Sequence, residues 1–137
     1  MPASLSRKLI AEFIGTFLLV FLAVGTAVFG IAAVVGADGN GPGSGVVGVA
    51  FGFGLVLLGL AYAIGPISGA HVNPAVTLAM LMGRRMPASE AVGYWVVQFP
   101  GGVAGARDIP HVSIWSRANP HVGVVANTSR ECLNVHP

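Results

Sequence analysis

The chain has 137 residues, of which 54% are hydrophobic and 9% are charged, with a formal net charge of +2 and a mean hydropathy of +0.78. Soluble domains carry roughly 25% charged residues, so this composition excludes an ordinary soluble enzyme and predicts a single integral membrane domain. Seven basic residues are too few for a nucleic-acid-binding surface, so no nucleic-acid partner is expected. The lone Cys132 supports neither a disulfide framework nor a cysteine-based metal cluster.

The first hydrophobic run predicts a helix over residues 8–35. From Phe13 to Val35 it holds 23 uncharged residues, enough to cross a hydrocarbon core of about 30 Å. Arg7 and Lys8 also resemble the basic start of a signal peptide. The apolar part of a signal peptide is only about 7–15 residues long, so a spanning helix is favoured.

A turn-rich segment over residues 36–45 separates this run from the second one. The second run, Val46–Ile64, contains no charged residue over its 19 positions. It predicts a second spanning helix over 46–65, closed by Gly65 and Pro66.

The next apolar stretch is too short to span a membrane and predicts a re-entrant half-helix over residues 74–83. Asn73 is a favourable N-cap, Pro74 suits the first helical position, and Gly83 ends the stretch. The carbonyl groups of residues 69–72 and the amide of Asn73 are candidate hydrogen-bonding groups for a polar solute.

A third helix is predicted over residues 88–106, with Pro100 interrupting it. Residues 107–137 mix polar, charged and apolar positions without a sustained period, which predicts an irregular tail.

The basic residues precede the first helix and follow the half-helix, and the 36–45 segment has none. The positive-inside rule therefore predicts a cytoplasmic N-terminus and an outward-facing 36–45 segment.

Four segments together resemble the aquaporin, or major intrinsic protein, family over roughly residues 7–106. They are Ala11-Glu12-Phe13-Ile14-Gly15-Thr16-Phe17, Ala50-Phe51-Gly52-Phe53-Gly54, Ser68-Gly69-Ala70-His71-Val72-Asn73-Pro74-Ala75-Val76-Thr77, and Val92-Gly93-Tyr94-Trp95 with Gln98. The third segment resembles the family's first pore signature. The resemblance implies an all-α membrane protein: the first inverted repeat of the aquaporin fold, with three spanning helices and one half-helix.

The resemblance also implies roles for particular residues. Asn73, Pro74 and Ala75 match the pore signature, and His71 and Gly69 belong to the same loop. Glu12 matches a buried carboxylate that accepts hydrogen bonds from that loop, with Thr16 beside it as structural support. Phe53 matches the second-helix member of the selectivity filter. Glycerol facilitators typically carry tryptophan there, so phenylalanine favours the water-selective, bacterial-type branch.

The family fold contains two such repeats, and these 137 residues match one. The second signature loop, the filter arginine and helices four to six are not found in them. The expectation is a truncated or frameshifted channel gene whose product sits in the plasma membrane as a multi-pass protein and does not conduct. The parent function is passive water transport, and the family forms homotetramers. A glycerol or other small-solute facilitator and a non-functional remnant remain the alternatives.

No nucleophile–base pair, phosphate-binding loop or metal-ligand spacing is found in the sequence, so neither an enzyme nor a cofactor or metal is expected. Without the family resemblance, Glu12 is also compatible with an interfacial carboxylate. His71 on its own is more often a structural residue than a ligand.

Overall fold

The computed structural model describes residues 3–28 and 45–118, except for the side chains of residues 45 and 112–118. The elements within these ranges are all helices: α1 (Leu5–Leu18), the π-helical segment η1 (Leu19–Val24), α3 (Gly45–Ser68), α4 (Pro74–Met82) and α5 (Ala88–Ala118). The predicted all-α membrane fold is confirmed for the described part. The predictions for residues 29–44 and 119–137 lie outside it.

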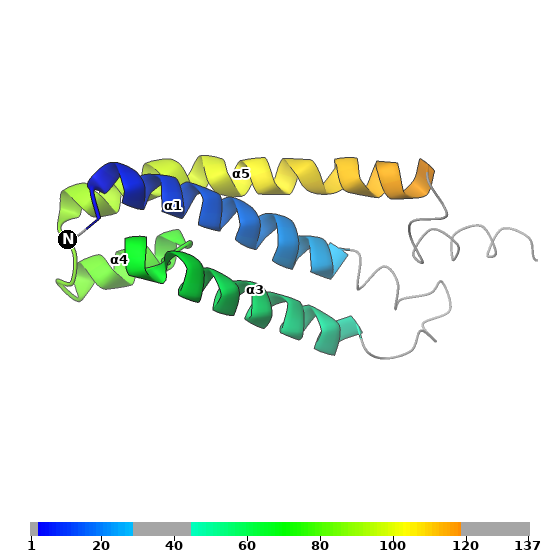
Figure 1. Ribbon diagram of the computed structural model, residues 1–137, viewed down its shortest axis with the longest axis horizontal. Coiled ribbons are helices and arrows are strands. Elements are labelled where there is room, and N and C mark those ends of the chain that lie inside the picture. The colour runs from blue at the N-terminus through cyan, green and yellow to red at the C-terminus, as the bar shows by residue number, and fades with distance from the viewer. Residues whose placement is uncertain (1–2, 29–44, 119–137) are drawn as a thin grey trace, which may run out of the picture.

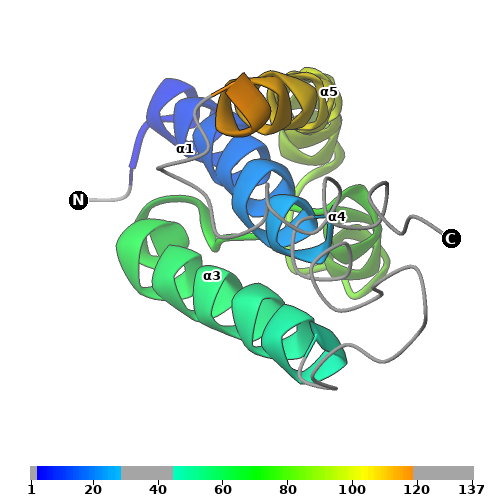
Figure 2. The same cartoon turned by 90° about the vertical axis from the view of Figure 1, so that its right-hand side faces the viewer.

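The three long helices run side by side, and α4 is a short segment at one end (Figure 1). The end view places α1 between α3 and α5 (Figure 2), with α4 packed against α5. After α3 the chain turns into the molecule and α4 carries it back to the same end (Figure 1). This return makes the 69–83 segment re-entrant.

Two helices among the described residues are long and apolar enough to cross a membrane, Leu5–Val28 and Val46–Ser68. Large hydrophobic side chains are exposed along them, including Ile10, Phe51 and Leu55. In contrast, the largest fully buried side chains are Tyr94, Gln98, Glu12 and Thr77. Since apolar side chains cover the outside and polar groups fill the centre, this arrangement suits a hydrocarbon solvent and not water.

The predicted helix ends differ from the observed ones wherever the prediction relied on proline or composition. α1 begins at Leu5, three residues before the predicted start. α3 runs through Pro66 to Ser68, because proline in the last turn removes one N–H while Gly69 N still donates to Gly65 O at 2.9 Å. α4 spans Pro74–Met82, with Gly83 as its C-cap, as the sequence predicts.

The third helix is the largest difference. α5 continues without a break through Pro100 and Pro110 to Ala118, so the prediction of a helix that ends at 106 and an irregular 107–118 segment is wrong. A proline inside a helix costs about 3 kcal/mol in water. Membrane helices tolerate it where a packed neighbour compensates, and α1 lies along α5.

The α1–α5 contact is close because α5 presents glycines to the backbone of α1. A Cβ atom added at Gly101 would lie 2.7 Å from Phe13 O, and one added at Gly105 would lie 2.6 Å from Phe17 O. Backbone atoms cannot move aside as a flexible side chain can. Glycine at these two positions therefore sets the distance between the helices.

We expect Gly101→Ala to lower the stability of the folded chain in detergent by about 1–3 kcal/mol, because the added methyl group overlaps the Phe13 carbonyl. The loss is measured by thermal unfolding followed by circular dichroism. Gly54→Ala is the matched control, since nothing lies within 4 Å of a Cβ added there. Equal stability of the two variants would contradict this account of the helix contact.

Candidate pore-signature site

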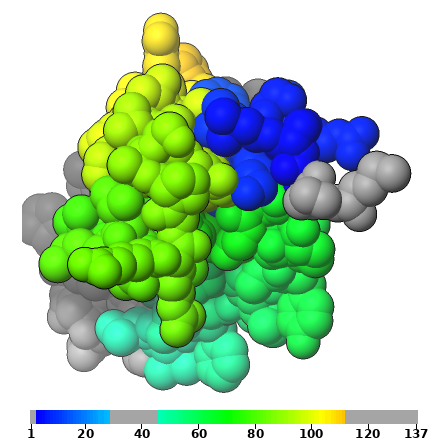
Figure 3. Space-filling model, turned by 90° about the vertical axis from the view of Figure 1, so that its left-hand side faces the viewer, coloured from blue at the N-terminus to red at the C-terminus, as the bar shows by residue number. Residues whose placement is uncertain are grey.

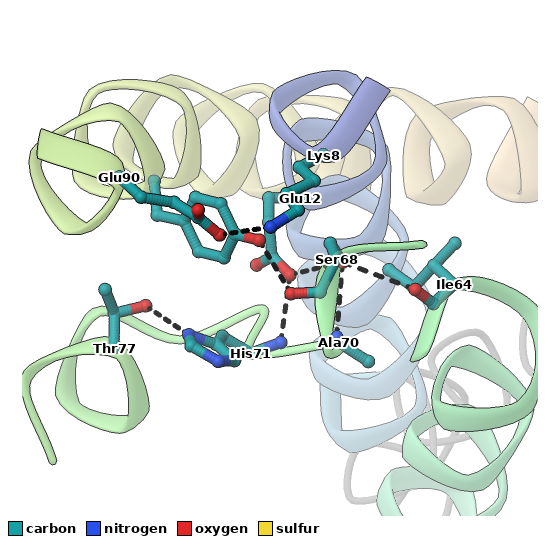
Figure 4. A network of polar contacts seen from close by, with 9 residues as sticks. Lys8, Glu12, Ile64, Ser68, Ala70, His71, Thr77 and Glu90 are labelled. Atoms are coloured by element: carbon teal, nitrogen blue, oxygen red, sulfur yellow. Dashed lines mark hydrogen bonds and ion pairs between the residues drawn. The ribbon is translucent and has the colours of Figure 1, made fainter. Parts of the chain in front are cut away.

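A buried carboxylate stands at the centre of the site (Figure 4). Glu12, on α1, is 0% exposed. Its Oε1 accepts hydrogen bonds from His71 N at 2.9 Å and Ser68 Oγ at 2.7 Å. Its Oε2 accepts from Val72 N at 2.7 Å and Gln98 Nε2 at 2.8 Å. The four donors come from the end of α3, the following loop and α5, so this one side chain joins three parts of the fold to α1.

The loop between α3 and α4 has a strained backbone. Gly69 has φ +89°, and the non-glycine residues Ala70 and Val72 have φ +49° and +42°. The left-handed region costs a non-glycine residue roughly 1–2 kcal/mol. Charge-assisted hydrogen bonds contribute about 1.5–3 kcal/mol each, so the two backbone bonds to Glu12 offset the strain. This conformation directs the N–H groups of residues 71 and 72 to the carboxylate.

A second set of polar contacts fixes His71 and the start of α4. His71 Nδ1 lies 3.1 Å from Thr77 Oγ1, and Gln98 Nε2 donates to the same hydroxyl at 3.1 Å. The Tyr94 hydroxyl donates to Ser68 O at 2.6 Å, and its ring meets the His71 ring edge to face at 5.1 Å between centroids. His71 is therefore buried and held on both sides of its ring.

Asn73 and Pro74 begin α4 as the sequence predicts. Asn73 has an extended backbone, and its Oδ1 accepts from Ala75 N at 2.8 Å. Trp95 Nε1 donates to Pro74 O at 3.0 Å, which ties the start of α4 to α5. The Asn73 side chain is exposed, and its Nδ2 atom has no partner among the described residues.

Within the part of the chain that the structure describes, the N–H groups of the loop have hydrogen-bond partners, whereas its carbonyl groups do not. Its N–H groups at residues 70, 71 and 72 bond to Ser68 and Glu12. By contrast, no described group donates a hydrogen bond to the carbonyl oxygens of residues 69–72. The loop thus has four carbonyl acceptors without a donor among the described residues, and Asn73, with its free amide donor, follows them directly in the chain. A small polar solute can accept from the amide and donate to the carbonyls.

Two residues with predicted roles lie outside this cluster. Phe53 is in α3, is 40% exposed, and has no ring contact or hydrogen bond with the described part of the signature loop. Thr16 Oγ1 donates at 2.7 Å to the backbone carbonyl of Glu12, within α1. The hydrogen bond of Thr16 therefore lies within the helix that carries Glu12, and its hydroxyl makes none to the described part of the loop.

The sequence contains further site residues to which the prediction gave no role. Ser68, Thr77, Tyr94 and Gln98 appear in the matched segments, yet their contacts were not predicted. For α5 the spacing of the polar residues is a signal for such contacts, because Tyr94 and Gln98 are four residues apart and share one face of a mostly apolar stretch of the helix. Polar side chains in such a helix usually face the interior of a bundle.

Comparison with known proteins identifies the family. The profile of the family described as "Major intrinsic protein" matches residues 2–135. The chain belongs to this family. Aquaporin Z of Brucella melitensis is 46% identical over 100 residues, which cover 73% of this chain and 41% of that protein. Glycerol uptake facilitator protein-like 6 of Lactiplantibacillus plantarum is 46% identical over 103 residues, 75% of this chain and 42% of that protein.

Members of the major intrinsic protein family are membrane channels and not enzymes. The chain spans about two-fifths of the length of these two curated relatives. The family profile matches as far as residue 135. The predicted end of the resemblance, near residue 106, therefore lies too early in the chain.

We expect Glu12→Gln to destabilise the folded chain by about 1–3 kcal/mol, the usual range for losing charge-assisted hydrogen bonds. Glutamine keeps one acceptor oxygen and places an NH2 group against two of the present donors. The change is measured as the loss of protease resistance at the 68–73 loop and as a lower midpoint of thermal unfolding.

Glu90→Gln is the matched control, because Glu90 is a partly exposed carboxylate whose ion pair with Lys8 measures 2.9 Å. Pairs of that kind contribute about 0–1 kcal/mol. If Glu12→Gln were no more harmful than Glu90→Gln, the carboxylate would not be what holds the loop.

Proposed function

We propose that this chain supplies one half of the wall of a channel for passive water flow across the plasma membrane. The supporting observation is the signature loop, whose four carbonyl groups at residues 69–72 have no donor among the described residues and directly precede the exposed Asn73. Backbone of this kind persists at membrane depth where it lines a water-filled cavity. The dipole of α4 places its positive end at the same point, which disfavours cations.

Water is the favoured solute, and glycerol is the second candidate. Of the two relatives named above, one is named an aquaporin and the other a glycerol uptake facilitator, and both are 46% identical to this chain. Sequence identity alone therefore does not separate the two candidates. Phe53 supports water, because the matching position in glycerol facilitators is typically tryptophan. Assembly into homotetramers, which the resemblance implies, belongs to the same proposal.

The described half leaves much of its surface without a partner. Only 6% of the apolar window of α3 is buried, against 33% for the helix that begins at Leu5. Lipid can cover apolar side chains, but it cannot donate hydrogen bonds to the loop carbonyls. A conducting pore therefore requires a second wall opposite α4, supplied by further polypeptide.

We expect residues 1–137 alone to leave the water permeability of vesicles unchanged, because one wall does not enclose a pore. The measurement is stopped-flow light scattering on vesicles that hold the purified chain, compared with empty vesicles. Permeability clearly above the empty vesicles, and abolished by Asn73→Trp, would overturn this expectation.

A chimera provides the positive arm of the same experiment. Residues 1–106 joined to the remaining segment of the Brucella relative should raise water permeability and leave glycerol uptake near the empty-vesicle rate. If glycerol entered the vesicles as fast as water does, the channel would be a glycerol facilitator and the assignment to water would be wrong. A folded chimera that passes neither solute would contradict the channel function proposed for this half.

Orientation is tested separately by cysteine labelling in a Cys132→Ser background. We expect an impermeant reagent added outside intact cells to label Gly41→Cys, which lies beyond the described residues, and not Ala88→Cys. The reason is the cluster of basic residues near the N-terminus and after α4. The reverse labelling pattern would invert the predicted topology.

A further inference from the structure

A cavity of about 360 Å³ opens at the end of the molecule where α1 begins and α3 ends. In Figure 3 the start of α1 (blue), the end of α3 (green) and the segment that leads into α5 (yellow-green) meet at this end. Its lining is partly polar, with Lys8, Arg85 and Glu90, and partly apolar, with Ile67, Met80 and Met86. The cavity thus combines charge with an apolar wall.

The unbalanced charge in the cavity is that of Arg85. Lys8 and Glu90 form an ion pair of 2.9 Å, so they largely cancel one another. The side chain of Arg85 is exposed and has no acidic or hydrogen-bonding partner within residues 3–28 and 45–111. The sequence around the cavity residues is cationic as well. Arg7 and Arg84, which adjoin Lys8 and Arg85 in the chain, are exposed and form no ion pair within the same ranges.

The backbone after α4 holds Arg85 beside the cavity. Arg84 takes a left-handed conformation with φ +53°. The following N–H of Arg85 then turns back to Met80 O at 2.9 Å. Arg85 is therefore placed by a hydrogen-bonded turn and not by a free loop.

The position of the cavity relative to a membrane follows from the helices. Both membrane-capable helices have an end here, one beginning at Leu5 and the other ending at Ser68. This end of the bundle therefore lies at the level of the lipid headgroups. The apolar side chain of Ile67 at the cavity is 38% exposed.

We propose that this cavity binds the phosphate of an anionic phospholipid headgroup, with Arg85 as the main contact. The guanidinium group matches a phosphate in shape and charge. Lys8 is a second donor at the cavity wall. The apolar wall and the exposed Ile67 favour a lipid over inorganic phosphate, because they can accommodate the glycerol and the first methylene groups. Ser68, Gly69 and His71 of the pore-signature loop also line the cavity, so a bound headgroup lies next to that loop.

The test uses the full 137-residue chain in nonionic detergent. Phosphatidylglycerol with a fluorophore on one acyl chain is titrated and followed by anisotropy, and phosphatidylcholine with the same label is the neutral probe. We expect tighter binding of phosphatidylglycerol, and about fivefold weaker binding after Arg85→Gln, equal to roughly 1 kcal/mol at 25 °C. Arg85→Lys, which keeps the charge, should recover part of the affinity.

Arg107→Gln is the matched control, because it removes the same charge from an exposed position in α5, roughly 28 Å along the helix from Ala88. The proposal is overturned if both probes bind equally, or if Arg107→Gln weakens binding as much as Arg85→Gln does. It is also overturned if inorganic phosphate binds the chain in an Arg85-dependent manner while phosphatidylglycerol does not. Circular dichroism establishes that all variants are folded.

Discussion

A carboxylate buried in an apolar bundle is stable only when donors surround it, and Glu12 obtains four of them from three parts of the fold. An unpaired charge at this depth would cost far more free energy than any single packing interaction could return. The loop between α3 and α4, the end of α3 and the polar face of α5 must therefore be in place together. The positions of Asn73 and of α4 depend on the same requirement.

The distribution of side chains follows from the solvent outside the bundle. Where lipid covers the surface, burying apolar side chains between helices adds little stability. Cohesion then depends on close backbone packing and on hydrogen bonds. The glycines of α5 supply the first, at Gly101 and Gly105. The hydrogen bonds of Tyr94 with the end of α3, and of Trp95 and Gln98 with α4, supply the second.

Local signals were sufficient to predict part of this structure from the sequence. The Asn73–Pro74 pair and Gly83 predicted both ends of α4, because capping depends on neighbouring residues alone. The end of α5 was not predicted, because the prediction ended this helix where the composition changes after Ala106, whereas the helix continues through Pro110 to Ala118. The link between Gln98 and Thr77 likewise exists only after two helices have packed. Family resemblance implied the role of Glu12, but no single-residue rule required its four partners.

The saturation of Glu12 has a consequence for the chemistry of anything that approaches the loop. Because the N–H groups of residues 70–72 already donate to Ser68 and Glu12, the backbone of residues 70–72 has only carbonyl oxygens left for a further hydrogen bond. A small uncharged molecule at this loop can therefore donate to backbone oxygen, but it must find its own donor elsewhere, as in the Asn73 amide.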